Sequence, residues 1–180
     1  MTEEIIIAGF GGQGVLSMGK ILAYAALMND LEVTWMPSYG PEQRGGTANV
    51  TVILSDSAIS SPVLDTYDIA VILNQQSLDK FESHVKPGGL LIYDPSGIHH
   101  KPVRHDITVL SVDAMTATIE MGNAKGYNMV LLGALIKARP MVSVDAVLRG
   151  LKKALPERHH HLIPANEAAL RRGMELVDTL

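Results

Sequence analysis

The run from Gly9 to Gly14 carries the clearest chemistry in the sequence, because its backbone could hold an anionic ligand. Gly9, Gly11 and Gly14 have the G-x-G-x-x-G spacing of dinucleotide-binding folds. An apolar run precedes these glycines, and a helical pattern follows them. At the start of a helix, unpaired N–H groups and the positive end of the helix dipole point outward and attract phosphates or carboxylates. The same residues also fit a tight strand-to-helix turn that binds nothing.

A second candidate site is the segment from residue 38 to residue 46, which reads Ser-Tyr-Gly-Pro-Glu-Gln-Arg-Gly-Gly. Loops with such residues often carry ligands or partners. Arg44 offers a planar guanidinium for a carboxylate or phosphate. Gly45 and Gly46 would let the chain pass close to that ligand, and Tyr39 and Glu42 add polar groups. The alternative is a structural loop in which Arg44 pairs with Glu42.

The sequence argues against a nicotinamide cofactor. A dinucleotide fold needs an acidic residue at the end of its second strand, about 20 residues past the glycines, to bind the ribose hydroxyls. Here that strand ends at Trp35-Met36-Pro37. Glu32 lies at its wrong end, and Glu42 lies well into the following loop.

Other catalytic groups are not indicated. The chain has no cysteine, which excludes disulfides, a cysteine nucleophile and an iron–sulfur cluster held by its own thiolates. His159, His160 and His161 are adjacent and would point in different directions, so a solvated loop is favoured over a metal site. No G-x-S-x-G elbow is present. Asn128 is expected to be the N-cap of the helix that follows it. We therefore predict no catalytic residue and no metal ligand.

The elements that must position these residues alternate between strands and helices. Strands are expected at residues 5–7, 31–36, 47–54, 68–73, 90–93 and 107–112, with Pro37 ending the second strand and Lys86 to Gly89 forming a turn. Helices are expected at residues 15–28, 76–84, 115–121, 128–138, 143–155 and 164–177. This order predicts a single α/β domain over residues 1–180. We expect a Rossmann-like, open, mostly parallel sheet with helices on both faces and further helices at the C-terminus.

Composition narrows the class of protein. Of 180 residues, 47% are apolar and only 19% are charged, which suggests that a subunit interface covers part of the surface. The net charge of −4 and the absence of a basic run argue against binding to nucleic acid. No apolar run approaches the roughly 18 residues of a membrane span, and no signal peptide is visible. A cytoplasmic protein is expected.

The two glycine-rich motifs together resemble the gamma subunit of 2-oxoacid:ferredoxin (acceptor) oxidoreductases. The resemblance covers essentially the whole chain. It is carried by Gly9 to Leu16, Tyr39 to Asn49, Lys86-Pro87-Gly88-Gly89, Gly126 with Asn128 and Met129, and Asn166 in the last helix. It implies a complex that oxidatively decarboxylates a 2-oxoacid to an acyl-coenzyme A and passes the electrons to ferredoxin or another low-potential acceptor. Such a complex uses thiamine diphosphate with magnesium, iron–sulfur clusters and coenzyme A.

The resemblance also implies partners: alpha and beta subunits and a ferredoxin-like delta subunit. Without cysteine, and without a Gly-Asp-Gly motif with a downstream asparagine, this chain should leave the clusters and the diphosphate to those partners. The resemblance suggests 2-oxoglutarate or a branched-chain 2-oxoacid as substrate. Taken alone, the chain is expected to be inactive and could form a homodimer.

In the complex, two segments of this chain are expected to face the active site, holding the phosphates of coenzyme A or closing the cavity. Their residues are Gly11, Gly12, Gln13 and Gly14, with Tyr39, Glu42, Arg44, Gly45 and Gly46. Two alternatives stay open. The chain could be a stand-alone nucleotide-binding module, or a purely structural subunit whose glycine motif only packs against its partners.

Overall fold

Strand β1 (Thr2–Phe10) lies inside a six-stranded sheet in the computed structural model, which describes residues 1–39 and 46–179. The strand order is β2-β3-β1-β4-β5-β6. Ile5, Ile6 and Ile7 are all fully buried, so both faces of β1 are covered, as its three consecutive β-branched residues predict. The other strands are β2 (Glu32–Tyr39), β3 (Thr47–Ser55), β4 (Tyr67–Ile72), β5 (Val85–Tyr93) and β6 (Thr108–Ser111).

The sheet is mostly parallel, as predicted. Strands β1, β4, β5 and β6 run parallel to one another, whereas β3 is antiparallel to both of its neighbours, β1 and β2. The chain leaves β1 through helix α1 (Val15–Leu27) to the outer strand β2, and then returns along β3 between them. Strand β3 therefore lies directly beside β1, in the place where a dinucleotide-binding fold has its second parallel strand.

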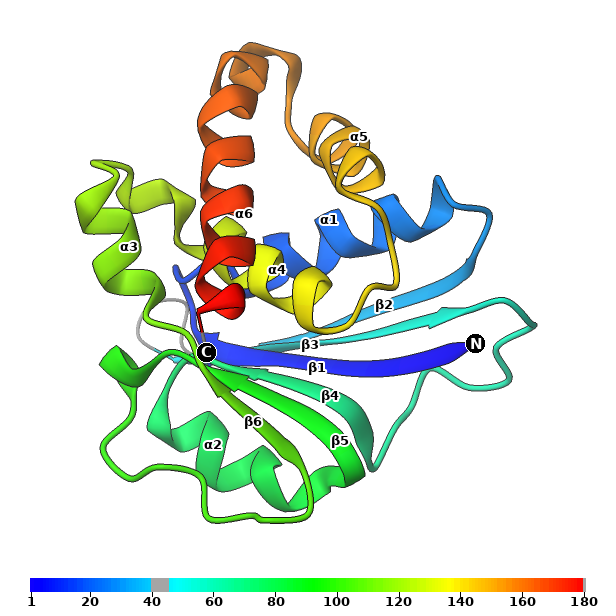
Figure 1. Cartoon of the computed structure of the whole chain (residues 1–180). Helices are drawn as coiled ribbons and strands as arrows, with labels where there is room; N and C mark the ends of the chain where they lie inside the picture. The colour runs from blue at the N-terminus through cyan, green and yellow to red at the C-terminus, as the bar shows by residue number, and fades with distance from the viewer. Residues whose placement is uncertain (40–45, 180) are drawn as a thin grey trace.

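Helices cover both faces of the sheet, but unequally (Figure 1). One face packs on α1 and on α4 (Tyr127–Ala138), α5 (Val144–Ala154) and α6 (Ile163–Asp178), in a core that includes Ile5, Ile7 and Val50. The other face packs on α2 (Gln75–Phe81), through a smaller core that includes Ile6 and Leu78. Helix α3 (Ala114–Glu120) lies at the end of the sheet where β1 finishes (Figure 1).

Helices α4 and α6 approach each other closely at two glycines. A Cβ atom added at Gly133 would lie 1.9 Å from the carbonyl oxygen of Leu170, and one added at Gly173 would lie 1.8 Å from that of Val130. Any larger residue would push the two backbones apart. The two glycines therefore let α4 and α6 pack backbone to backbone.

Two boundaries differ from those expected. Pro37 does not end β2 but lies within it, opposite Val50. A proline is tolerated there because β2 is an edge strand, hydrogen-bonded on one side only. Lys86 to Gly89 belong to β5 rather than to a turn before it. The register between β4 and β5 shifts at these residues, because Tyr67 pairs with Val85 but Ile69 pairs with Leu90.

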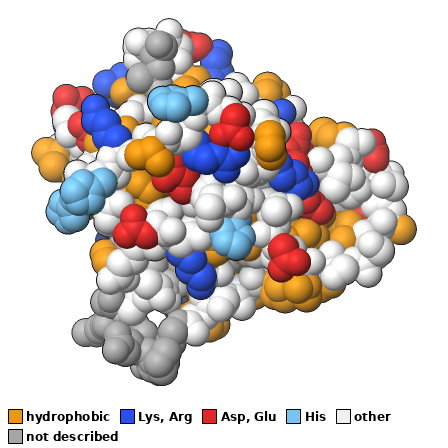
Figure 2. Space-filling model, turned by 90° about the horizontal axis from the view of Figure 1, so that it is seen from below, with side chains coloured by type: hydrophobic (Ala, Val, Ile, Leu, Met, Phe, Trp, Pro, Cys, Tyr) orange, Lys and Arg blue, Asp and Glu red, His pale blue; other side chains and the backbone are white. Residues whose placement is uncertain are grey.

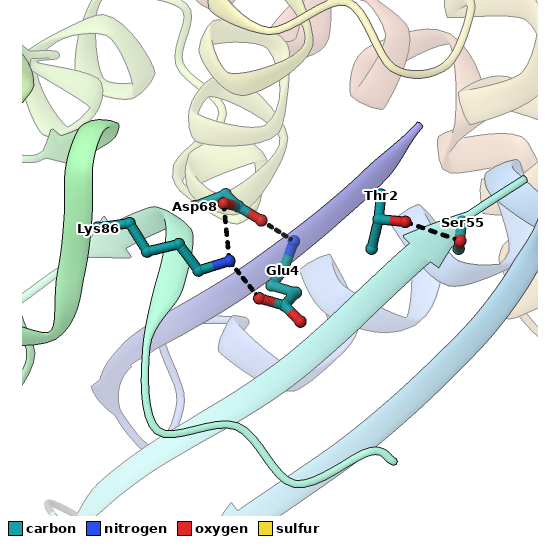
Figure 3. Close-up of polar contacts among 5 residues, drawn as sticks. All are labelled: Thr2, Glu4, Ser55, Asp68 and Lys86. Atoms are coloured by element: carbon teal, nitrogen blue, oxygen red, sulfur yellow. Dashed lines mark hydrogen bonds and ion pairs between the residues drawn. The ribbon is translucent and has the colours of Figure 1, made fainter. Parts of the chain in front are cut away.

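Ion pairs join the strands at the amino end of β1, the end of the sheet that lies away from the glycine turn (Figure 3). The ammonium group of Lys86 pairs with the carboxylate of Glu4 and, at 2.9 Å, with Oδ1 of Asp68. Asp68 Oδ2 also accepts a hydrogen bond from the backbone N–H of Glu4, at 2.9 Å. Burial disfavours the charged form of Lys86, but hydrogen bonds with Glu4 and Asp68 outweigh burial and raise its pKa. This cluster joins β1, β4 and β5 far from the glycine motif.

Candidate functional site

The glycine turn, residues 11–14, connects the carboxyl end of β1 to helix α1. Gly12 has φ +92° and Gly14 has φ +78°, which are left-handed conformations that other residues rarely adopt. Gly14 is the N-cap of α1 and supplies no side chain to bond the first N–H groups of the helix. The turn therefore needs glycine at both positions, as its sequence predicts.

The start of α1 is available to an anion. The first turn of the helix contains no acidic residue. The N–H of Gly11 donates to the carbonyl of Gly46, at 2.9 Å, but the N–H groups of Val15 and Leu16 find no acceptor among the described residues. Free N–H groups and an uncompensated helix dipole together favour a negatively charged ligand.

Gln13 holds the turn in place. Its Oε1 accepts a hydrogen bond from the N–H of Phe10, at 2.7 Å, and its Nε2 lies 3.5 Å from the carbonyl oxygen of Leu73 at the end of β4. Gly9 makes room for this side chain, since a Cβ atom there would lie 2.6 Å from Oε1. Both ends of the amide thus contact the protein, and a direct contact between Gln13 and a ligand stays a prediction.

Two hollows lie on either side of the glycine turn. The first hollow, of about 430 Å³, lies between the turn, the start of α1 and the end of β2, where Tyr39 forms part of its rim. The second hollow, of about 490 Å³, lies between the turn, α3 and the first turn of α4. Gly12 and Gly14 line both hollows. Among residues 1–39 and 46–179, no atom lies within 4 Å of a Cβ atom added at Gly12, so this part of the chain leaves room for a ligand to approach the turn.

Asn128 does not cap its helix, contrary to expectation. Helix α4 begins one residue earlier, at Tyr127, and Gly126 is its N-cap. The side-chain amide of Asn128 instead donates to the carbonyl of Gly14, at 3.4 Å. The short 3₁₀ segment η3 (Ala124–Gly126) runs directly into α4, which leaves no place for a side-chain cap.

The structure brings together only part of the second predicted motif. Tyr39 is the last residue of β2 rather than a loop residue, and its side chain is 67% exposed beside the first hollow. Gly46 reaches the glycine turn through its hydrogen bond with Gly11. Glu42, Arg44 and Gly45 lie outside the described residues.

Several residues that line the second hollow were not predicted from the sequence. Met115 and Ile119 from α3 line it, and they are 40% and 71% exposed. Lys125 adds an exposed cation that makes no ion pair within the described part of the chain. These residues follow no motif, and only the packing of α3 and α4 against the glycine turn brings them there.

A buried carboxylate lies next to the second hollow. Asp94 directly follows β5 and is fully buried. Its Oδ1 accepts from the N–H of Ser96, at 2.8 Å, and its Oδ2 from the N–H of Met115, at 3.1 Å. Burial raises the pKa of Tyr127, and the nearby charge of Asp94 raises it further. The Tyr127 hydroxyl is buried and makes no hydrogen bond of good geometry with any described residue.

The histidine run is not in a loop but in a 3₁₀ helix, η4 (Glu157–Leu162), which leads into α6. His160 Nε2 lies 3.0 Å from the carbonyl oxygens of both Lys152 and Leu155, and His161 Nδ1 lies 3.0 Å from that of Arg158. Across residues 1–39 and 46–179, no group of three acidic, histidine or cysteine side chains is arranged to hold a metal ion. Within those residues, no helix is long and apolar enough to cross a membrane.

Comparison with known proteins links this arrangement to one family. Residues 4–176 match the family described as "Pyruvate ferredoxin/flavodoxin oxidoreductase". The 2-oxoglutarate synthase subunit KorC of Methanothermobacter marburgensis is 35% identical, over 98% of this chain and 97% of its own. The ketoisovalerate oxidoreductase subunit VorA of the same organism is 42% identical over 74% of this chain, but the match spans only 28% of that relative.

Two solved structures have the same fold. The keto/oxoacid ferredoxin oxidoreductase gamma subunit from Geobacter sulfurreducens PCA superposes with a TM-score of 0.83, at 29% identity, over 99% of both chains. The 2-oxoglutarate:ferredoxin oxidoreductase from Magnetococcus marinus, solved with 2-oxoglutarate, coenzyme A and succinyl-CoA bound, superposes with a TM-score of 0.89, at 25% identity. That match covers 99% of this chain and 31% of the longer one.

Proposed function

Because this chain belongs to the pyruvate ferredoxin/flavodoxin oxidoreductase family, we propose that it is the gamma subunit of a 2-oxoacid:ferredoxin oxidoreductase. The family match and the end-to-end similarity to KorC confirm the resemblance noted in the sequence. In the proposed reaction a 2-oxoacid loses CO₂, its acyl group forms a thioester with coenzyme A, and the electron pair released passes to ferredoxin. Residues 1–180 would supply one gamma-type domain of the complex, in the cytoplasm.

The substrate would be 2-oxoglutarate or a branched-chain 2-oxoacid. KorC, a 2-oxoglutarate synthase subunit, supports the first substrate through a match along nearly its whole length. VorA, a ketoisovalerate oxidoreductase subunit, supports the second with a higher identity over a shorter match. Assaying the assembled complex with both 2-oxoacids would decide between them.

The chemistry of electron transfer would belong to partner subunits. This chain has no cysteine, so its residues do not fit an iron–sulfur cluster. It also lacks the Gly-Asp-Gly motif expected of a thiamine diphosphate and magnesium site. Alpha, beta and ferredoxin-like delta subunits would carry these groups, and ferredoxin would dock on the complex.

The contribution of this chain would be to bind coenzyme A and close the active site. The observation that carries this proposal is the start of α1, which lies between two hollows and which no described residue caps or covers at Gly12. Phosphates of coenzyme A could accept hydrogen bonds from the backbone there, and Arg44 could add a guanidinium. Closing the cavity would keep water away from the reactive acyl intermediate.

The surface around the glycine turn also favours a covered site. Tyr39 on one side, and Met115 and Ile119 on the other, expose apolar side chains at the rims of the two hollows. On the α2 side of the molecule, Figure 2 shows charges of both signs and histidines among apolar side chains. A partner subunit would therefore cover the end of the sheet that carries the glycine turn, which accounts for the apolar composition.

The test is a pair of glycine variants in the assembled complex. Gly12→Ala adds a methyl group to the open space over the turn, whereas Gly88→Ala adds one to open space at the amino end of the sheet. Both residues have a positive φ, so both variants carry similar backbone strain. We expect Gly12→Ala to raise the KM for coenzyme A about tenfold, the equivalent of about one charge-assisted hydrogen bond, and Gly88→Ala to leave it unchanged.

A third variant tests the second motif. Arg44→Ala should weaken the dependence of turnover on coenzyme A while decarboxylation of the 2-oxoacid stays nearly intact. If Gly12→Ala and Arg44→Ala both form active complexes with an unchanged KM for coenzyme A, the chain is a purely structural subunit. If the purified chain alone binds NAD or a flavin, it is instead a stand-alone nucleotide-binding module.

A further inference from the structure

We infer that Asp94 is a positioning residue for the second hollow, an inference that rests on the proposed function. Asp94 is fully buried, yet no cation pairs with it among the described residues. Burying an unpaired carboxylate is costly unless hydrogen bonds satisfy its oxygens. Here backbone N–H groups do so, one on each oxygen, from Ser96 and Met115.

The bond to Met115 sets the position of α3. The first N–H groups of a helix have no acceptor within the helix itself. Asp113, the N-cap of α3, satisfies the N–H of Thr116, at 3.0 Å. Asp94 satisfies that of Met115 and so ties the start of α3 to the end of β5. Because Met115 also lines the second hollow, this bond fixes one of the hollow's walls.

Tyr127 lies in the wall of the second hollow that α4 forms, and the Asp94 carboxylate acts on it. It is the first residue of α4 and lines the second hollow. Burial raises the pKa of its hydroxyl, and the charge of Asp94 raises that pKa further. The next residue, Asn128, reaches the glycine turn through its hydrogen bond with Gly14. Asp94 is therefore bonded to one element that lines the second hollow, α3, and its charge acts on a residue of the other, α4.

Position 94 needs a carboxylate because two N–H groups, those of Ser96 and Met115, each donate to one of its oxygens. An asparagine at this position has one carbonyl oxygen and one NH₂ group. Whichever way its amide is turned, the NH₂ group would meet the N–H of either Ser96 or Met115. The variant Asp94→Asn therefore loses one of the two bonds while keeping nearly the same volume. Displacement of α3 would then weaken coenzyme A binding without touching a reacting atom.

The experiment compares Asp94→Asn with Asp68→Asn in the assembled complex. Asp68 also accepts a hydrogen bond from a backbone N–H, that of Glu4, but at the amino end of the sheet. Both variants should lower the thermal unfolding temperature, so kinetics are measured well below both transitions. We expect Asp94→Asn to raise the KM for coenzyme A about fivefold with kcat within about twofold of wild type, the pattern of lost binding. Asp68→Asn should change neither constant.

A second pair of variants covers the case in which Asp94→Asn does not assemble. Met115→Pro removes the N–H that Asp94 accepts, together with the methionine side chain, and breaks no hydrogen bond within the helix because Met115 lies in the first turn of α3. Met115→Leu keeps that N–H and has a similar apolar side chain. The proline variant should raise the KM for coenzyme A, and the leucine variant should not.

The outcomes separate the two proposals. Asp94 has no positioning role if Gly12→Ala raises the KM for coenzyme A but Asp94→Asn leaves it unchanged. Where Asp94→Asn does not assemble, the same conclusion follows from an unchanged KM in Met115→Pro. An equal rise in KM for Asp94→Asn and Asp68→Asn would overturn the inference as well, because general loss of stability would then explain it. If Gly12→Ala and Arg44→Ala have no effect on this KM either, the proposed binding of coenzyme A fails.

Discussion

The side-chain amide of Asn128 donates a hydrogen bond to the carbonyl oxygen of Gly14, with the two atoms 3.4 Å apart. These residues are 114 positions apart in the sequence. The bond joins the first turn of α4 to the N-cap of α1, directly beside the predicted ligand site. The glycine turn, which Gln13 also holds, is thus tied to a helix from the second half of the chain.

This contact makes Gly14 intolerant of substitution. A Cβ atom at Gly14 would lie 2.7 Å from Nδ2 of Asn128, and φ +78° adds backbone strain. We expect Gly14→Ala to lower the free energy of unfolding by about 3 kcal/mol, measured by urea denaturation. Gly12→Ala shares the strain but meets open space, so its loss should be closer to 1 kcal/mol.

A double variant isolates the clash. Asn128→Ala removes the amide group that a Cβ atom at position 14 would hit. The double variant should therefore lose less unfolding free energy than the sum of the losses in Gly14→Ala and Asn128→Ala. Strict additivity would show that Asn128 does not restrict Gly14.

Gln13 should matter for stability through its side-chain amide. Gln13→Leu leaves the N–H of Phe10 without its acceptor, which should cost about 1–2 kcal/mol of unfolding free energy. Gln13→Glu keeps an acceptor for that N–H and places a negative charge near the start of α1, where the helix dipole favours it. Chemical denaturation should rank the glutamate variant above the leucine variant. The reverse order would mean that the amide does not hold the turn.

Alkaline pH should weaken the amino end of the sheet. The pKa of Lys86 is raised in the folded chain because its hydrogen bonds with Glu4 and Asp68 outweigh the effect of burial. Folding therefore favours the protonated amine. The resulting stabilisation is fully present below the unfolded pKa of about 10.4 and is lost as the pH rises through the folded pKa.

The variant Lys86→Met should flatten this alkaline loss and leave two carboxylates without their cation. At neutral pH we expect it to lower the free energy of unfolding by about 1 kcal/mol, a modest value because Lys86 is partly exposed. Lys137→Met is the control, since Lys137 pairs with the exposed Asp178. If both variants have the same pH dependence as wild type, the Lys86 cluster does not stabilise the folded chain.

Local patterns predicted most of the elements but not their irregularities. The triple isoleucine of β1 and the glycine turn that follows were predicted correctly, because burial on both faces and positive φ angles leave direct marks in the sequence. Pro37 misled the prediction of β2, because a proline ends a central strand but not an edge strand, and edge position is a property of the whole sheet. Lys86 to Gly89 have the composition of a turn, although β5 begins before them.

Residue types and their order are enough to establish that a strand, a glycine turn and a helix present backbone N–H groups, and that this chain holds no thiolate. These properties depend on residue type and short spacing alone. The folded chain was needed to show that Asn128 bonds to Gly14 rather than capping its own helix, and that Asp94 and Met115 meet beside the second hollow. Such contacts depend on how α3, α4 and α6 pack, and packing joins residues whose separation in the sequence carries no periodic signal.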